Sequence, residues 1–182
     1  MYVRAANGVT VQSAALAQVA AHSSMQAVIV RAPLVYGAPP QGNLAALLAI
    51  ADSPLPLPFA AIDNRRSFIA LDDLCAALIA CASVEAAAGR TYLVAHRDAV
   101  STPRLLIAAR HALGRPARLY RIAPRILEAM AAAIGASANV RRLTRSLEAD
   151  PSRAERELGW RAERSIDDTM VRLARAWREA RR

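Results

Sequence analysis

The stretch from Ala27 to Gly37, Ala-Val-Ile-Val-Arg-Ala-Pro-Leu-Val-Tyr-Gly, constrains the fold of this chain more than any other. It begins with apolar, largely β-branched residues, and a continuous run of this kind is typical of a strand buried in a parallel sheet. Pro33 has no N–H to donate, so we expect it to end the strand, and Gly37 permits a sharp turn. The prediction is a buried strand that opens into a loop, which in open α/β sheets is where ligands bind.

Helical and extended patterns alternate around this stretch, and this order predicts an α/β fold. A helix is expected over residues 11–23, with Leu16 and Val19 on one face. Asn43 is expected to cap the next helix, and Asp72 or Asp73 the one after it. Further strands are predicted over 68–71, 90–95 and 119–122, and helices over 44–51, 74–82, 124–134 and 139–147. A helix with a hydroxyl cap at Ser101 and a proline in its first turn is expected to end at Gly114. A short helix is expected to begin at Pro151 with Asp150 as its N-cap, and a last one to end at Arg182.

The chain has 182 residues, of which 54% are hydrophobic, and this length suits one domain with a true core. It is too short for a complete dinucleotide-binding domain followed by a substrate domain. Prolines and regular arginines interrupt every apolar run before the roughly 20 residues that a membrane helix needs, and the first residues do not resemble a signal peptide. We therefore expect a cytoplasmic protein with no membrane segment. The spacing of Cys75 and Cys81 predicts two free thiols.

The positive charge is confined to the second half of the chain. All 24 basic residues are arginine, and 18 of them, with 9 of the 15 acidic residues, lie in residues 101–182, so this half carries the whole net charge of +9. Such a field favours an anionic partner, either a phosphorylated small molecule or a nucleic acid, although solvated arginine-rich helices would give the same composition. No recognisable nucleic-acid module supports the second partner. No His, Cys, Asp and Glu spacing is typical of a metal site, and His96 and His111 are expected to face solvent.

Four motifs carry a resemblance to a known family. They are Arg-Ala-Pro-Leu-Val-Tyr-Gly over residues 31–37, Gly-Asn-Leu over 42–44, Asn-Arg-Arg-Ser over 64–67, and the tail that contains Leu-Gly-Trp over 158–160. Together they resemble the nucleotide-sugar epimerases and dehydratases of the extended short-chain dehydrogenase/reductase family, over residues 11–180 and in the C-terminal portion of that family only. The resemblance implies that residues 1–42 are the trailing helix and strand of a Rossmann-like domain, and that residues 43–182 form the substrate-binding region.

The resemblance also implies which residues contact ligands. Pro33 and Tyr36 would contact an NAD or NADP cofactor that is otherwise bound by residues outside this chain. Asn43 and Leu44 would bind a nucleoside diphosphate sugar at a helix N-terminus, which favours phosphate in any case.

The remaining substrate contacts lie further along the chain. Leu57 and Phe59 would line a cradle for the base, with a polyproline ligand motif as the generic alternative. Arg66 matches the arginine of the family that binds phosphate, and a guanidinium is the planar, bidentate donor that phosphate recognition prefers. An arginine among residues 141–145 would reach the phosphates as well, and Arg142 is our choice there.

The catalytic parts of the family are missing from this sequence. The resemblance places a Tyr-x-x-x-Lys pair at the start of the 11–23 helix, but the nearest tyrosine, Tyr2, is followed four residues later by Ala6, and the chain contains no lysine. A phenol near its ordinary pKa of about 10 is a poor base at neutral pH without such a cation. The 7 glycines form no Gly-x-x-Gly-x-x-Gly turn for a dinucleotide. We therefore predict no catalytic residue in this chain.

Three functions follow from these observations. The first is the nucleotide-sugar-binding portion of an NAD(P)-dependent epimerase or dehydratase, which is inactive alone and pairs with a missing N-terminal portion or with a second copy. The second is a non-catalytic nucleotide-sugar-binding module. The third, and the least supported, is a basic nucleic-acid binder.

Overall fold

The computed structural model describes residues 18, 21, 26–37, 39–133, 135 and 137–181. The helix predicted over residues 11–23 therefore lies outside the described residues, apart from Gln18 and Ala21, and so do Tyr2 and Ala6. The side chains of residues 137–139 and 142 also lie outside the description.

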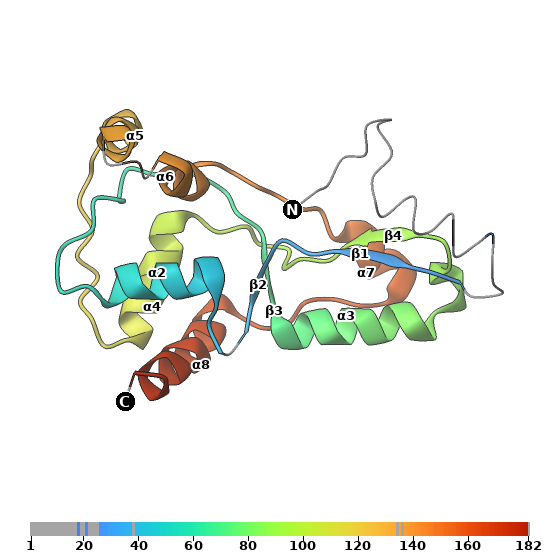
Figure 1. Ribbon diagram of the computed structural model, residues 1–182. Helices are drawn as coiled ribbons and strands as arrows, with labels where there is room; N and C mark the ends of the chain where they lie inside the picture. The colour runs from blue at the N-terminus through green and yellow to red at the C-terminus, as the bar shows by residue number, and fades with distance from the viewer. Residues whose placement is uncertain are drawn as a thin grey trace.

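Two parallel strand pairs connect the two ends of the molecule (Figure 1). Strand β1 (Ile29–Arg31) pairs with β4 (Thr91–Leu93), and β2 (Leu34–Tyr36) pairs with β3 (Phe68–Ala70). In each pair, at least one helix lies along the chain between the two strands, as parallel pairing requires. The α/β fold with parallel strands is confirmed.

The loop predicted directly after Pro33 is wrong. The chain bends at Pro33 and then forms β2, in which Leu34 is in register with Phe68 and Tyr36 with Ala70. Proline ends the β1 ladder because it has no N–H, but the apolar residues that follow it retain their preference for extended structure and find a new partner in β3.

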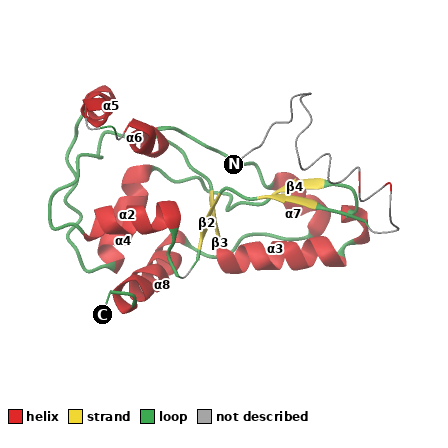
Figure 2. Cartoon of the chain, in the orientation of Figure 1, coloured by secondary structure: helices red, strands yellow, loops and turns green. Residues whose placement is uncertain are grey.

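Three helices pack together at one end of the molecule (Figure 2). They are α2 (Gly42–Asp52), α4 (Thr102–Ala112) and α8 (Ile166–Glu179). Their buried faces form the larger hydrophobic core, to which Tyr36 and Phe68 from β2 and β3 also contribute. The rings of these two residues stack with their centroids 5.1 Å apart.

A smaller core lies at the other end, where α3 (Leu71–Ser83) and α7 (Ser152–Leu158) pack near β4 and the short 3₁₀ helix η1 (Glu85–Ala87). Tyr92, Trp160 and Ile69 are among its buried members. The two remaining helices, α5 (Pro124–Ala133) and α6 (Ser137–Thr144), contribute no described residue to either core and pack side by side (Figure 1). In place of a strand over 119–122, Leu119 makes a single bridge with Leu57.

The helix starts differ from the predicted caps at three places. Helix α7 begins at Ser152 with Pro151 as its N-cap residue, so the cap predicted at Asp150 is wrong. Helix α2 begins at Gly42 with Gln41 as its N-cap residue, so Asn43 lies inside the first turn and is not a cap. Helix α3 begins at Leu71, so Asp72 and Asp73 also lie in the first turn, where their charge still suits the positive end of the helix dipole. The cap predicted for α4 is confirmed, because Ser101 Oγ accepts a hydrogen bond from the main-chain N–H of Arg104.

Candidate functional site

A cavity of about 190 Å³ lies between β2, α2, α4, α6 and the loop that precedes β3. Its wall is mostly aliphatic, with three polar residues among the side chains. The lining residues are Leu34, Asn43, Ala46, Leu47, Ile50, Arg66, Thr102, Leu105 and Leu143.

The parallel strands β1 and β4 direct the chain toward this cavity. The segment that leaves β1 reaches it at Leu34, and the segment that leaves β4 reaches it at Thr102. In open α/β sheets, ligands bind beyond the carboxyl ends of the strands, so the cavity occupies the position expected of a binding site.

One face of α2 forms a wall of the cavity. Asn43, Ala46, Leu47 and Ile50 follow the i, i+3, i+4, i+7 spacing that places residues on one side of a helix. Asn43 is exposed and lies in the first turn, where the N–H groups of Leu44 and Ala45 already donate to the carbonyl of Gln41. The positive end of the α2 dipole therefore lies at the cavity that Arg66 also lines.

The main chain at Arg66 is held from both sides. Arg66 and Val100 exchange two main-chain hydrogen bonds of 2.9 Å. On the opposite side, Leu147 N–H donates to the carbonyl of Arg65 and Ser67 N–H donates to the carbonyl of Leu147, each at 2.9 Å. The Arg66 guanidinium also donates from Nη1 to the carbonyl of Arg145, at 3.2 Å. A side chain on such a fixed backbone is positioned before any ligand arrives.

The polar groups of the cavity differ in what they can offer a ligand. The hydroxyl of Thr102 donates to the carbonyl of Leu143 at 2.7 Å and accepts from Asn64 Nδ2 at 3.1 Å, so it is already used within the protein. Arg66 and Asn43 supply a cation and an amide. An aliphatic cavity with a cation at its edge suits a ligand that joins a planar or apolar body to an anionic group.

The structure brings only part of the predicted substrate set to this cavity. Asn43 and Arg66 line it together. Leu44 and Leu57 are buried in the larger core, and Phe59 packs against that core, so none of these three is among the lining residues. Residue 142 belongs to α6, but its side chain lies outside the described part of the chain.

The two residues predicted to contact a cofactor lie on the strand side of the molecule. Pro33 is at the bend between β1 and β2. Tyr36 is 1% exposed and borders a separate hollow of about 160 Å³ with Gly37 and Arg172. Burial raises the pKa of the Tyr36 phenol, and the charge of Arg66 lowers it to a smaller extent, so this hydroxyl stays protonated at neutral pH. A buried, protonated phenol does not by itself fit a dinucleotide.

Several lining residues escaped sequence reasoning. Thr102 lies at the start of a predicted helix, where a hydroxyl is ordinary, and Leu34 and Leu143 carry no chemical signal in an apolar context. The only signal for Thr102 was its place after a predicted strand, since the carboxyl ends of parallel strands meet at one edge of a sheet.

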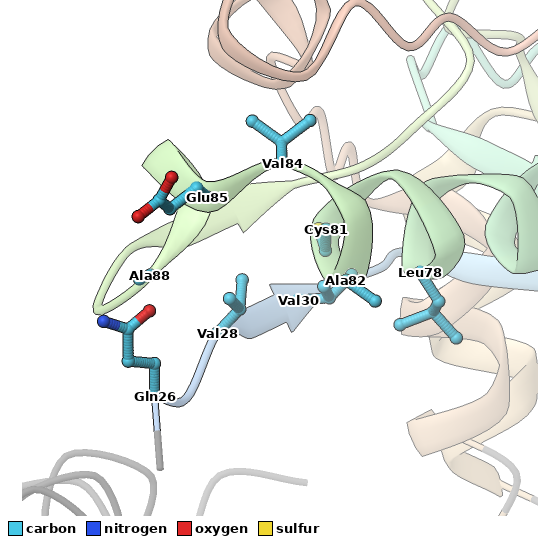
Figure 3. A pocket seen from close by; sticks show the side chains of 9 residues that line it. All are labelled: Gln26, Val28, Val30, Leu78, Cys81, Ala82, Val84, Glu85 and Ala88. Carbon is cyan, nitrogen blue, oxygen red and sulfur yellow. The ribbon is translucent and has the colours of Figure 1, made fainter. Parts of the chain in front are cut away.

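A second cavity, of about 340 Å³, lies between β1 and the C-terminal half of α3 (Figure 3). Val28, Val30 and Leu78 are among its lining residues, and Glu85 is the charged residue there. Cys81 also borders it, and burial raises the pKa of its thiol. Among the described residues that line this cavity, none is a cation that could bind an anionic ligand.

The remaining predictions concern the histidines, metal binding, membrane helices and the two cysteines. The ring of His96 stacks on Phe68, with the centroids 5.4 Å apart, and is half-buried, whereas His111 is exposed as expected. Within the described ranges, no group of three or more His, Cys, Asp and Glu side chains could hold a metal ion. None of the described helices has the length and hydrophobicity needed to cross a membrane. Cys75 and Cys81 are free thiols.

The sequence is similar to that of a curated protein. The chain is 30% identical over 166 residues to a UDP-glucose 4-epimerase from Vibrio cholerae, across 91% of this chain and 51% of the relative. The chain is similar to the C-terminal part of that epimerase. It spans about half the length of this epimerase, and no protein-family model matches it.

Solved structures support the same fold as the epimerase relative. The structure of RMD from Pseudomonas aeruginosa complexed with NADPH superimposes with a TM-score of 0.66 at 15% identity, over 92% of this chain and 53% of that one. A UDP-glucose 4-epimerase from Bifidobacterium longum in complex with NAD+ and UDP gives a TM-score of 0.62 at 21% identity, over 93% and 52%. A UDP-glucose 4-epimerase from Thermotoga maritima with UDP-glucose gives 0.64 at 13% identity, over 96% and 55%. At these identities the likeness establishes the fold alone.

Proposed function

We propose that this chain is the nucleotide-sugar-binding part of an NAD(P)-dependent epimerase or dehydratase, and that the cavity beside Arg66 receives a nucleoside diphosphate. The observation that carries the proposal is that Arg66 and Asn43 line one cavity although they are distant in sequence and come from different elements. The similarity to a UDP-glucose 4-epimerase and the UDP and UDP-glucose bound in two structures of the same fold support it.

The cavity fits one portion of such a ligand. Its volume of about 190 Å³ lies below the roughly 300–1,000 Å³ of sites that enclose a whole small molecule. The aliphatic walls suit the base, while the Arg66 guanidinium and the first turn of α2 suit the diphosphate. The sugar then extends beyond the cavity.

We also propose that the chain does not catalyse the reaction alone. It contains no lysine and no glycine-rich dinucleotide turn, so hydride transfer needs groups from another polypeptide segment. In this proposal residues 1–42 are the trailing part of a Rossmann-like domain and residues 43–182 are the substrate-binding region. Within the described residues, β1 pairs on one side only, with β4, and its other edge is where a further strand could pair.

A non-catalytic binding module is the second candidate, and the same absence of lysine favours it. The two candidates share the cavity and differ in whether a catalytic portion exists. Nucleic-acid binding has less support, because many arginines of the second half already pair with carboxylates, as Arg104 does with Asp167 and Arg172 with Asp72.

Calorimetric titration of the purified chain with UDP tests the shared part of the proposal. We expect saturable binding, and Arg66→Ala should weaken it about tenfold or more, since a hydrogen bond to a charged group contributes about 1.5–3 kcal/mol. Arg175→Ala is the matched control, because it removes the same charge from an exposed residue that pairs with Glu179 on α8. Absence of UDP binding, or an equal loss in both variants, would contradict the proposal.

A further inference from the structure

Asn64 is a buried amide that joins three segments of the chain. It is 1% exposed and lies two residues before Arg66. Its Oδ1 accepts a hydrogen bond of 2.8 Å from the main-chain N–H of Thr102. Its Nδ2 lies within hydrogen-bond distance of Thr102 Oγ1 at 3.1 Å, of the Leu143 carbonyl at 3.0 Å and of the Arg145 carbonyl at 3.1 Å. These partners are 38, 79 and 81 positions away in sequence.

The partners of Asn64 belong to the cavity. Thr102 and Leu143 both line it, and Thr102 Oγ1 donates to the Leu143 carbonyl at 2.7 Å. The third partner, the Arg145 carbonyl, also accepts from Nη1 of Arg66. Asn64 and Arg66 therefore share one acceptor, so the position of the guanidinium depends on where the amide holds residue 145.

We propose that Asn64 is a positioning residue of the anion site: it fixes the segment 143–145 against the start of α4, and through the Arg145 carbonyl it orients Arg66 for the phosphate groups of the ligand. This proposal rests on the proposed function, because the anion in question is the diphosphate assigned to the cavity above.

The chemistry of the site requires an amide. Three oxygen atoms surround Nδ2, and a donor is needed to hold them together. A carboxylate at this position would keep the acceptor for the Thr102 N–H but would repel the Leu143 and Arg145 carbonyls, and it would regain one donor only on protonation. Burial among acceptors raises the pKa of a carboxyl group. The isosteric variant Asn64→Asp thus separates the donor role from side-chain size.

The test is a double-mutant cycle in UDP binding between Asn64→Asp and Arg66→Ala, measured by calorimetry at pH 8. The fitted stoichiometry reports the fraction of competent protein, so a loss of affinity is separated from a loss of folded protein. We expect Asn64→Asp to weaken UDP binding about tenfold, and the double variant to bind no more weakly than Arg66→Ala alone, because the two changes remove the same contact. Asn64→Asp should lower the affinity for uridine, which lacks the phosphates, much less than it lowers the affinity for UDP.

Two additional measurements distinguish positioning from general destabilisation. The affinity of Asn64→Asp relative to the unchanged chain should rise as the pH falls from 8 to 6, as the carboxyl group gains a proton and donates again. Asn64→Gln keeps the amide and should therefore bind UDP more tightly than Asn64→Asp. Tyr92→Phe, which removes a hydrogen bond to Glu157 in the smaller core, is the control and should bind UDP normally.

The outcomes separate this proposal from the proposed function. If the unchanged chain does not bind UDP, the proposed function is wrong and the role of Asn64 is overturned with it. If the unchanged chain binds UDP and depends on Arg66, but Asn64→Asp binds equally well or its effect simply adds to that of Arg66→Ala, only the positioning role is overturned.

Discussion

Arg110 donates a hydrogen bond of 2.7 Å from Nη2 to the main-chain carbonyl of Leu55, from a side chain that is 1% exposed. The same guanidinium donates to the carbonyls of Ala51, Ser53 and Arg118. Ala51 lies at the C-terminal end of α2, where the helix dipole favours a cation. One arginine of α4 thus donates hydrogen bonds to the C-terminal end of α2 and to the proline-rich segment that follows it.

We expect Arg110→Met to lower the free energy of unfolding by about 3 kcal/mol, because several buried carbonyls lose their donor together. Urea denaturation measures this difference. Arg110→Lys, which keeps the charge but has fewer donors in a different geometry, should recover only part of the loss. Arg175→Met, an exposed control on α8, should stay within about 0.5 kcal/mol of the unchanged chain. A similar result for Arg110→Met would show that the carbonyls find other donors.

The next prediction concerns the close contact between Gly37 and the start of α3. A Cβ atom built at Gly37 would lie 2.8 Å from both Cβ and Cδ2 of Leu71. Because Leu71 Cβ is fixed by the helix backbone, Gly37→Ala should lower the free energy of unfolding by about 1–3 kcal/mol. The double variant Gly37→Ala with Leu71→Ala removes the Cδ2 contact and keeps the Cβ contact, so it should recover part of the loss. Complete tolerance of Gly37→Ala in thermal denaturation would contradict this packing.

The sequence predicted the elements of the fold better than their ends. The apolar runs at β1 and β4 predicted the parallel strands, but β1 is only half-buried and Leu93 of β4 is exposed, so the predicted burial of the first strand is wrong. The pattern around Asn43 misled, since an amide before a leucine-rich run is typical of an N-cap, whereas the helix begins at Gly42, two residues before the predicted start.

Two of the three polar residues that line the candidate cavity could be chosen before the structure. Arg66 and Asn43 were chosen by resemblance and do line one cavity. Leu44 was predicted beside Asn43 but faces the core. Adjacent positions on a helix point about 100° apart, and no local pattern tells which apolar side chain borders a cavity, so Leu143 could not be chosen in advance.

The third prediction concerns Asn43, which was expected to cap α2 but lies inside its first turn. As Asn43 is exposed and is not the N-cap of α2, Asn43→Ala should change the free energy of unfolding by less than about 0.5 kcal/mol. Ser101→Ala is the matched variant, because Ser101 does cap α4, and it should cost about 1 kcal/mol. Calorimetry with UDP should show the opposite order, with the larger loss of affinity for Asn43→Ala. Equal destabilisation by both variants would restore Asn43 as a cap.

The last prediction concerns the pH dependence of stability through Glu157. Its carboxylate accepts hydrogen bonds from the Tyr92 hydroxyl and from Arg153, at 2.9 and 3.0 Å, and these interactions hold its pKa below the ordinary value. The folded state therefore binds a proton less readily than the unfolded state. The resulting stabilisation is complete above the unfolded pKa of about 4.3 and is lost as the pH falls through the lower, folded pKa.

Glu157→Gln should lower the Tm at pH 7, and the difference from the unchanged chain should shrink steadily below about pH 4. Glu179→Gln, at an exposed i,i+4 pair on α8, is the control and should leave the profile nearly unchanged. A Tm difference for Glu157→Gln that stays constant from pH 7 to pH 3 would mean that the charge of this carboxylate contributes nothing to folding.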